Sequence, residues 1–596
     1  MSQFYSEIVA LMQAADFEQA LVRLNAHLTA TPDDVEARHL RALAHGRTGQ
    51  YDAARQEFTA LESLHPQPHA VMSNLGNLEV RAGRPDAAAT AYRKALDYKP
   101  DFSDAGVNLA NLLAGQGQVD AAADLFETVL SHAPTHLGAL NGLGNARLRQ
   151  DRPEDALSAF NRALEVNPGA VLCRINRAGA YRSLGQLEAA LSDLEAACQQ
   201  APNGADGHFQ RGVTLRMLKR DADARLAFQV ALTCDAMRAD IHSAYAGLLW
   251  ENGAGEESTV ALRSVLERQP NADLSHVLAR IQLRSGQPDA ALASTESALQ
   301  SDPGHALSLA LRGELRIRLG DHASGLADLA AADAASGGTN PVVRLQYAEA
   351  LLGQGEAKKA LDLLDHEPEG DQLQKYVALK TLAWRELGDE RYRSYYDYDR
   401  FTWTGLIETP DGFDSLEDFN RQLSAAIARL HTTRVQPLDQ TLFGGTQSPG
   451  RLWNESDPVI AALSQALLAA AKRFVDGLPD DSDHPFLQRK TGAVKLAGAW
   501  SVRLHSGGGH VDHIHPAGWI SASYYVDVPK TVMDGDKAGW LRLGGSGVSG
   551  LDLPAERHIR PEPGRIVFFP SYMWHGVEPF ESDSVRVTAP FDVIPA

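Results

Sequence analysis

Apolar residues follow two different periods along this chain. Through most of its length they recur at helical spacing, as at Phe126, Val129 and Leu130, which places them on one face of a helix. Toward the C-terminus they alternate within short β-branched and aromatic runs separated by Gly, Pro and Asp, a pattern typical of strands. The pattern predicts a long helical region followed by a sheet-forming domain.

The helical region repeats, with three columns of residues that recur every 34 positions. One column holds proline, one holds alanine and one holds only alanine or glycine. The columns are Pro32, Pro66, Pro100, Pro134, Pro168, Pro202 and, after Ala236, Pro270; Ala20, Ala54, Ala88, Ala122, Ala156, Ala190 and Ala224; and Ala42, Gly76, Ala110, Gly144, Ala178, Gly212 and Ala246. Small residues let paired helices approach closely, and proline ends the second helix of each pair. A two-helix unit of this period resembles the tetratricopeptide repeat.

The resemblance covers residues 1–390, which would hold about eleven units. The period slips by one residue near Pro303, later units are looser, and a helix at 371–390 is expected to cap the stack. The resemblance implies an all-α superhelix of antiparallel helix pairs with a concave groove that binds a protein or peptide. A recurring asparagine series is a candidate lining of that groove: Asn74, Asn77, Asn108, Asn111, Asn141 and Asn145.

The composition of the chain limits which classes of binding partner and which cellular location are expected. The chain has 596 residues, more than one ordinary domain, and a formal net charge of −20. Without a Lys/Arg block, neither nucleic acid nor an anionic membrane surface is expected as a main partner. The only cysteines, Cys173, Cys198 and Cys234, form no disulfide framework and are typical of a reducing compartment. With no basic signal segment and no long apolar run, we expect a cytoplasmic protein with no membrane span.

Residues 391–490 lose the repeat pattern and form a connector. An aromatic-rich stretch at 392–403 comes first, and helices are predicted from Ser415 to Leu430 and from Pro458 to Leu478. Ser415 is the expected N-cap of the first of these helices. These elements are expected to flank the C-terminal domain and to dock it on the repeats.

Residues 491–596 are predicted to form the sheet domain. Its strands are expected at Val494–Leu504, Ile520–Val528, Gly539–Leu543, Arg565–Phe569 and Ser584–Val593. Many short strands separated by turns indicate a β-sandwich or jelly roll.

Histidines cluster between the first two of these strands. Since residues two apart on a strand share a face, His513 and His515 project together, and His510 and Asp512 project together toward the other face. These pairs are mutually exclusive as metal ligands. A third ligand must come from a distant strand, for which His575 is the candidate. Imidazole donors with open coordination positions suit catalytic first-row metals, including iron.

The motif around these histidines resembles a bacterial subgroup of 2-oxoglutarate- and Fe(II)-dependent oxygenases attached to tetratricopeptide repeats. The resemblance covers residues 395–596 and is specific in its final part. The residues that carry it are His513, His515, Pro516, Gly518, Trp519, Ser521 to Val526, Pro561, Gly564, Phe568 to Ser571, Trp574, His575, Gly576, Arg586 and Thr588.

The resemblance implies a double-stranded β-helix (jelly roll) that uses Fe(II), 2-oxoglutarate and O₂. His513 and His575 would bind iron, with His515 in the usual aspartate position; the set His510, Asp512 and His575 is the alternative that restores a carboxylate. The distal carboxylate of 2-oxoglutarate would pair with Arg586, assisted by Thr588. Three further roles follow: either Tyr524 or Tyr525 reaches the same carboxylate, Trp519 and Trp574 wall the substrate pocket, and Arg503 is a second anion contact or a surface charge.

Three functions are consistent with this sequence. The first is a hydroxylase, a 2-oxoglutarate/Fe(II)-dependent dioxygenase whose repeats recruit a protein or peptide substrate. The second is a non-catalytic repeat scaffold for protein–protein interaction with a metal-binding jelly-roll domain, where the metal would be structural zinc. The third is an oxygenase acting on a small molecule, with the repeats used for assembly.

Overall fold

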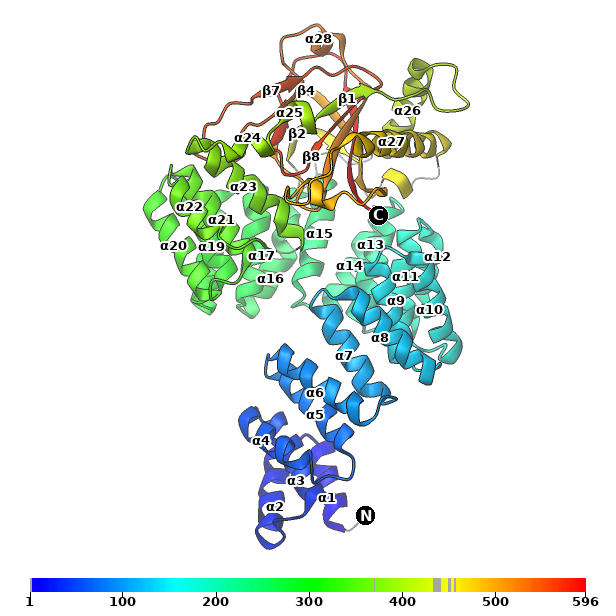
Figure 1. Cartoon of the computed structure of the whole chain (residues 1–596), viewed down its shortest axis with the longest axis vertical. Coiled ribbons are helices and arrows are strands. Elements are labelled where there is room, and N and C mark those ends of the chain that lie inside the picture. The colour runs from blue at the N-terminus through cyan, green and yellow to red at the C-terminus, as the bar shows by residue number, and fades with distance from the viewer. Residues whose placement is uncertain (1–2, 369, 432–440, 449–451, 455–456) are drawn as a thin grey trace. The chain divides into compact units, whose positions relative to one another are not determined.

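The computed structural model describes residues 3–368, 370–431, 441–448, 452–454 and 457–596. The chain divides into two compact units, Met1–Gln210 and Arg211–Ala596, with helices through most of its length and a sheet at the C-terminal end (Figure 1). The sheet lies wholly in the second unit, which therefore holds both the later repeats and the predicted site.

The first unit consists of paired helices, and the second helix of each pair starts 34 residues after its predecessor, at Phe17, Tyr51, Pro85, Val119, Pro153 and Leu187. The predicted period is therefore the period of the helices themselves. The helices are α1 Gln3–Gln13, α2 Phe17–Ala30, α3 Val35–Arg47, α4 Tyr51–Leu61, α5 Pro68–Arg81, α6 Pro85–Tyr98, α7 Ser103–Gly115, α8 Val119–His132, α9 Leu137–Arg149, α10 Pro153–Val166, α11 Val171–Ser183 and α12 Leu187–Gln200; α13, Ala205–Met217, crosses the boundary.

The small-residue columns lie where paired helices touch. Every alanine of the second column, from Ala20 to Ala224, is fully buried. In the third column a Cβ at Gly76, Gly144 or Gly212 would overlap the ring of an aromatic residue on the next helix, respectively Tyr92, Phe160 and Phe228. Glycine therefore occurs in this column where a ring needs the space that alanine would fill.

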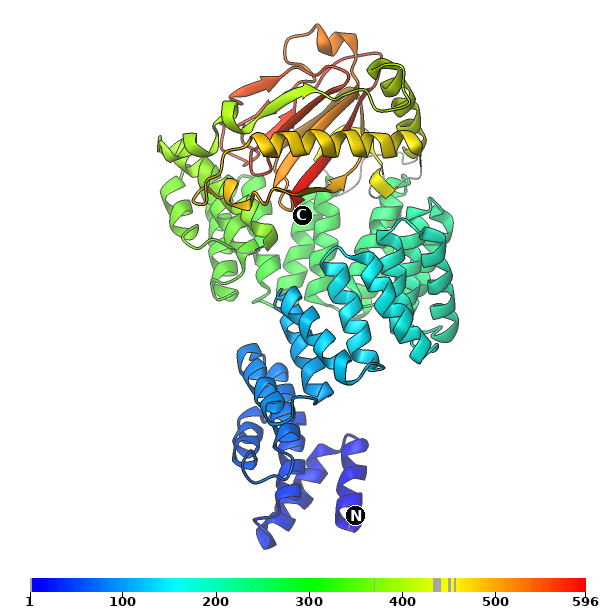
Figure 2. The same cartoon turned by 45° about the vertical axis from the view of Figure 1, so that its right-hand side comes forward.

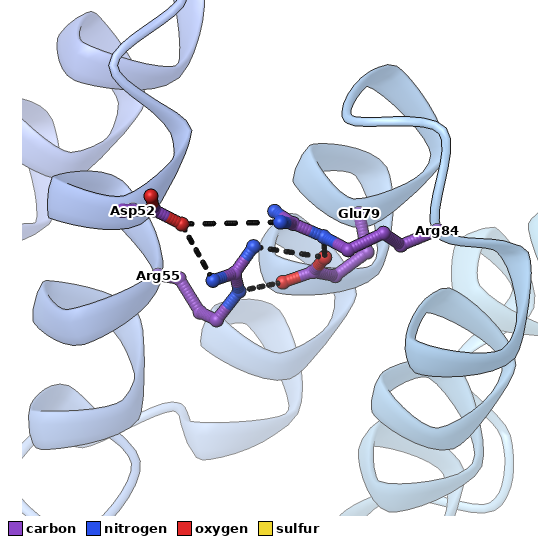
Figure 3. A network of polar contacts seen from close by, with 4 residues as sticks. All are labelled: Asp52, Arg55, Glu79 and Arg84. Atoms are coloured by element: carbon purple, nitrogen blue, oxygen red, sulfur yellow. Dashed lines mark hydrogen bonds and ion pairs between the residues drawn. The ribbon is translucent and has the colours of Figure 1, made fainter.

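Buried ion pairs reinforce the helix pairs at equivalent repeat positions. On adjacent helices, Arg41 pairs with Glu57, Arg177 with Asp193 and Arg312 with Asp328, each at 2.6–2.7 Å. Figure 3 shows a related cluster in which Glu79, only 2% exposed, accepts from Arg55 on α4 and from Arg84 after α5, while Asp52 pairs with the same two arginines. Such carboxylates are buried only because each has cationic partners.

The asparagine series bonds within the protein. The Oδ1 of Asn77 accepts from Tyr92 at 2.7 Å and from Asn108 of the next repeat at 3.1 Å. Asn141 accepts from Asn176 in the following repeat at 2.8 Å. Asn77 and Asn141 therefore link successive repeats. The expectation from the sequence was only that the asparagines line the groove.

The second unit continues the helical repeats up to Glu386. The slip in the period comes earlier than expected: α17 starts 33 residues after α15, so the change falls before Pro303. Its helices are α14 Asp221–Cys234, α15 Ala239–Glu251, η1 Gly255–Thr259, α16 Val260–Arg268, α17 Ala272–Arg284, α18 Pro288–Ser301, α19 Ala306–Arg318, α20 His322–Ala335, α21 Pro341–Gly353, α22 Ala357–Leu363, η2 Gly370–Gln372, α23 Leu373–Glu386, α24 Arg391–Tyr395 and α25 Tyr398–Phe401.

The C-terminal domain is a curled antiparallel sheet in which β1-β8-β5-β10-β4-β9-β6-β7 lie in that order, with β2 also paired to β4 and β3 to β10. Its strands are β1 Trp403–Leu406, β2 Leu442–Gln447, β3 Val494–Ala499, β4 Val502–His513, β5 Ile520–Asp527, β6 Leu541–Leu543, β7 Arg557–Ile559, β8 Arg565–Pro570, β9 His575–Val577 and β10 Arg586–Pro595. The run predicted as one strand at 494–504 breaks at Trp500, so that β4 extends to the histidine cluster.

The connector contributes strands as well as helices. Both β1 and β2 come from residues 391–490, which the sequence assigned to flanking helices. The predicted helices are present as α26, Leu416–Leu430, capped by the Ser415 hydroxyl, and α27, Pro458–Gly477; the remaining elements are η3 Leu452–Asn454, η4 Leu487–Arg489 and α28 Lys530–Met533. The connector is therefore part of the sheet domain.

Helix α27 is long and apolar enough to cross a membrane by length and composition, with a mean hydropathy of 1.3. Its apolar face packs into the core of the sheet domain, where the Phe474 ring stacks on Phe568 of β8 at 5.2 Å. Figure 2 shows this helix, in yellow, lying across the sheet. This packing is that of an amphipathic helix covering a sheet.

The last repeat helix packs directly against the sheet domain. Arg385 of α23 donates to the carbonyl oxygens of Gly544 and Pro554, and Trp574 donates through Nε1 to the carbonyl of Ala378. Tyr396, after α24, accepts a hydrogen bond from the Trp574 backbone N–H at 3.1 Å. The segment just before β9 therefore depends on the end of the repeats.

A glycine substitution tests the packing of the columns. We predict that Gly144→Val lowers the stability of the first unit by about 2 kcal/mol or more, because the added carbons meet the buried Phe160 ring. Gly115→Val in α7, where a Cβ has open space, is the matched control and is expected within about 0.5 kcal/mol of wild type. Urea unfolding followed by circular dichroism compares the two; equal effects would contradict this account.

Candidate metal centre

Three histidines converge where β4 and β9 pair. His513 ends β4 and stands opposite His575, the first residue of β9, while His515 follows β4 by two residues. The ring centroid of His575 lies 4.2 Å from that of His513 and 4.9 Å from that of His515. One nitrogen from each ring can be chosen so that all three lie within 4.8 Å of one another. Neutral imidazoles so arranged can share one metal ion.

The hydrogen bonds at the far side of each ring set its orientation. The Nδ1 of His513 lies 2.8 Å from the Val511 carbonyl, and the Nδ1 of His575 lies 2.9 Å from the Met573 carbonyl. The Nδ1 of His515 lies 2.6 Å from a carboxylate oxygen of Asp592. Since these partners accept, each Nδ1 carries the proton and each Nε2 keeps its lone pair. Metal-ligating histidines use this arrangement.

Burial favours the neutral form of His513 and His575. Desolvation, with the nearby His515, lowers the pKa of His513 to about 3, and desolvation holds the pKa of His575 well below its ordinary value. A neutral imidazole is the form that binds a metal. The site is thus preorganised to accept a cation.

The alternative ligand pair separates in the structure. The pairing of β4 with β9 shifts register between His510 and His513, so the simple alternation expected for this strand fails here. His510 therefore lines the same cavity as His513, with their ring centroids 5.7 Å apart. Asp512 instead forms an ion pair with Arg542 of β6 at 2.8 Å.

The predicted anion-binding residues meet on the same side of the cavity. Arg586 and Thr588, two apart on β10, are 2% and 3% exposed and both line it. The guanidinium of Arg586 lies over the ring of Tyr525, 5.2 Å from its centroid. The Nε of Arg586 and the Tyr525 hydroxyl are buried and have no hydrogen-bond partner among the described residues. Unpaired buried polar groups are costly, so a ligand that pairs with them is favoured.

Strand alternation decides between the two tyrosines. The Tyr524 hydroxyl donates to Asn420 of α26 at 2.6 Å, so this side chain points to the outer face of the sheet. Tyr525 points inward, toward Arg586. Burial raises the pKa of Tyr525, which keeps its hydroxyl protonated and able to donate.

The cavity encloses about 490 Å³ of space, open mouth included. The four histidines, Arg586 and Thr588 line it together with Trp500, Ala522, Ser523, Leu541, Phe569, Gly576, Val577 and Pro590. Polar groups converge in an otherwise apolar hollow, the usual character of a small-molecule site.

Three residues expected at the pocket lie elsewhere. Trp519 is fully buried and donates through Nε1 to the Phe486 carbonyl at 2.7 Å. Trp574 packs against α23, as described above. Arg503 lies on β4 next to the inward-facing Leu504, and alternation turns it away from the cavity. None of the three lines this cavity, and for Arg503 the position agrees with the alternative of a surface charge.

Sequence reasoning missed Trp500 and Asp592. Trp500 interrupts the run predicted as one strand and lines the cavity. Asp592 continues the series Arg586, Thr588 and Pro590 at every second position of β10. That spacing, which places all four on one face, was a signal available in the sequence.

These observations define the class of protein: paired-helix repeats followed by a sheet domain with a buried three-histidine site. Family models of the tetratricopeptide repeat match residues 5–70, 79–143, 113–174, 175–244, 276–341 and 341–366. The model described as "Putative 2OG-Fe(II) oxygenase" matches residues 498–592. The chain is a tetratricopeptide-repeat protein with a C-terminal domain of that oxygenase family.

Parts of the chain are similar to known proteins. Tetratricopeptide repeat protein 28 of Homo sapiens is 36% identical over 80 residues, and the match covers 13% of this chain but only 3% of that protein. Among solved structures, a tetratricopeptide repeat protein from Parabacteroides merdae has 18% identity and a TM-score of 0.34, covering 48% of this chain and 98% of that one. Yeast Tom70 has 13% identity and a TM-score of 0.39, covering 66% and 96%.

The three-histidine site makes a direct prediction about metal affinity. His575→Ala removes one of the three donors and is expected to weaken Co(II) binding by more than about 100-fold. This exceeds the usual loss when a residue that only hydrogen-bonds to a metal ligand is removed. His510→Ala is the matched control, since His510 lines the cavity outside the three-histidine group, and its affinity is expected to stay near that of wild type. Anaerobic titration followed by visible absorption measures both. Loss in His510→Ala with retention in His513→Ala would favour the other ligand set.

Proposed function

We propose that this protein is a 2-oxoglutarate- and Fe(II)-dependent dioxygenase that hydroxylates its substrate. One observation carries the proposal: a three-histidine donor set and a buried guanidinium that has no carboxylate partner among the described residues meet in one cavity. A metal site alone would not need the guanidinium. A dianionic ligand that reaches from the metal to Arg586 accounts for both.

The donor set fits Fe(II). Three imidazole nitrogens, from His513, His515 and His575, leave coordination positions open to a chelating ligand and to O₂. Bound Fe(II), with 2-oxoglutarate and O₂, would supply the oxidative decarboxylation that yields succinate and CO₂ and drives hydroxylation.

The other residues of the cavity bind and orient the co-substrate. Arg586 offers a planar fork that matches a carboxylate, and Thr588 adds a hydroxyl donor from the same face of β10. The Tyr525 hydroxyl, which burial keeps protonated, is a third donor at this end. Apolar walls at Phe569 and Leu541 limit water around the reacting atoms.

The topology supports a double-stranded β-helix. Strands far apart in sequence alternate across the curled sheet, so that β10 lies between β5 and β4, and β9 lies between β4 and β6. Such crossing connections are typical of jelly rolls. The arrangement brings ligands from β4 and β9 and the anion-binding pair of β10 into one barrel-like interior.

Replacing the guanidinium tests the proposal. Arg586→Gln is expected to weaken 2-oxoglutarate binding to the Fe(II) protein by at least about 30-fold, because a buried charge pair is lost. Arg503→Gln, an arginine on the neighbouring strand outside the cavity, is the matched control and should bind as wild type does. Calorimetry measures binding, and succinate formation under O₂ measures turnover.

The outcome that contradicts an enzyme is specific. Protein that retains Zn(II) as isolated and forms no succinate with Fe(II), 2-oxoglutarate and candidate substrates would support the repeat scaffold with a non-catalytic metal site. Three imidazoles also suit zinc, and this supports the second candidate, a repeat scaffold with a non-catalytic zinc site.

We further propose that the repeats recruit a protein or peptide substrate. Arrays of tetratricopeptide repeats present extended surfaces suited to such partners. In the second unit the end of the array packs against the sheet domain through Arg385 and Ala378. A peptide bound to these last repeats would therefore be held on the same structural unit as the cavity. A location in the reducing cytoplasm is part of this proposal, since an odd and sparse set of three cysteines, Cys173, Cys198 and Cys234, is typical of a reducing compartment.

A truncation separates recruitment from chemistry. Because α23 supports the segment before His575, removing residues 1–390 would damage the site itself. Removing residues 1–202 instead ends the deletion between α12 and α13 and keeps the second unit. We expect substrate-independent succinate formation to persist and hydroxylation of the true substrate to fall, both followed by mass spectrometry. Full activity on that substrate after the deletion would exclude recruitment by the first unit.

A further inference from the structure

We propose that Asp592 is a positioning residue that supplies, from behind His515, the negative charge that a directly bound carboxylate would otherwise give the metal. This inference rests on the proposed metal site. It follows from a contrast among the three histidines: His513 and His575 each have a neutral backbone carbonyl at Nδ1, whereas His515 has a carboxylate.

The contact between Asp592 and His515 is close and well shielded. Their Oδ1 and Nδ1 atoms lie 2.6 Å apart, and the two side chains are 11% and 13% exposed. At that distance the carboxylate accepts a hydrogen bond from Nδ1–H. This makes the opposite nitrogen, Nε2, a stronger donor to a metal. The Asp592–His515 pair therefore behaves as one anionic ligand, while the other two rings are neutral ligands.

The fold holds the Asp592 carboxylate in place. The Ser521 hydroxyl on β5 donates to the same Oδ1 at 3.0 Å and lies 2.9 Å from the Ser571 hydroxyl. Gly518 leaves room beside the pair, since a Cβ there would overlap Ser571 and approach Asp592. The pairing of β10 with β3 also shifts register between Phe591 and Val593, at Asp592 itself. These supports fix the carboxylate against the ring.

A second aspartate close to the cluster has no such role. Asp512 directly precedes His513 but forms an ion pair with Arg542, and no ligand histidine contacts it. Its charge is balanced by that guanidinium. Of these two aspartates, only Asp592 can transmit charge to the metal through a ligand.

Substitution that removes the charge but keeps the shape tests the inference. Asp592→Asn retains an oxygen that can accept from His515 and Ser521, and it is expected to weaken Co(II) binding by about 10- to 100-fold and to shift the visible d–d bands. Asp512→Asn, the matched control, is expected to change the affinity by less than about 3-fold and to leave the bands in place. The thermal midpoints of the metal-free proteins report any structural damage, expected to be within about 4 °C of wild type.

A double-mutant cycle makes the test independent of folding losses. His515→Asp places a carboxylate directly in the ligand set. In that background Asp592→Asn should weaken Co(II) binding by less than about 3-fold, whereas in the wild-type background it is expected to weaken it by about 10- to 100-fold. Asp592→Glu keeps the charge and is expected to bind Co(II) more tightly than Asp592→Asn does. Weaker binding by the glutamate variant would count against the inference.

The outcomes distinguish the inference from the function on which it rests. Wild-type protein that does not bind Co(II) at all would overturn both. Wild-type binding with an unchanged affinity and spectrum in Asp592→Asn would overturn the charge role of Asp592 and leave the proposed oxygenase intact. Equal losses in Asp592→Asn and Asp512→Asn, or equal costs of Asp592→Asn in both backgrounds, would also overturn it.

Discussion

The site depends on the pairing of β4 with β9, which sets His513 opposite His575. Strand β9 is only three residues long, and the turn that leads into it is held from outside by Tyr396 and by the last repeat helix. These contacts add to the pairing of β9 with β4 and β6, which sets the register of His575. The three-histidine group, the face of β10 that carries Arg586 and Thr588, and the end of the repeats are therefore parts of one structural unit.

Electrostatics explains why this arrangement suits an anionic ligand. Three imidazoles and a desolvated guanidinium share a largely apolar cavity, and burial lowers the pKa of Arg586, while Tyr525 opposes that shift. Such a cavity would be stabilised by an anionic ligand that pairs with the arginine, as the proposed function requires. Asp592 places a negative charge at the Nδ1 side of the His515 ring, opposite the nitrogen that would face a metal in the proposed site.

Much of the fold could be predicted from the sequence because the relevant signals are local. Helix pairs, their period and the small residues between them follow from spacing alone, and the Ser415 cap follows from a short motif. The strands of residues 391–490 were missed, since β1 and β2 are short and acquire their strand character only by pairing with β8 and β4. Trp519 and Trp574 were expected at the pocket but lie outside it. The position of a tryptophan in the sequence does not specify against which neighbouring segment its side chain packs.

The sequence by itself determined the repeat array, the sheet domain and the candidate residues His513, His575, Arg586 and Thr588, because period and motif spacing encode them directly. Tertiary structure decided three other matters. The register shift in β4 brought His510 into the cavity and left Asp512 with Arg542, alternation on β5 turned Tyr525 inward, and β10 carried Asp592 to His515. Each depends on strand pairing between distant segments, whose register no local pattern specifies.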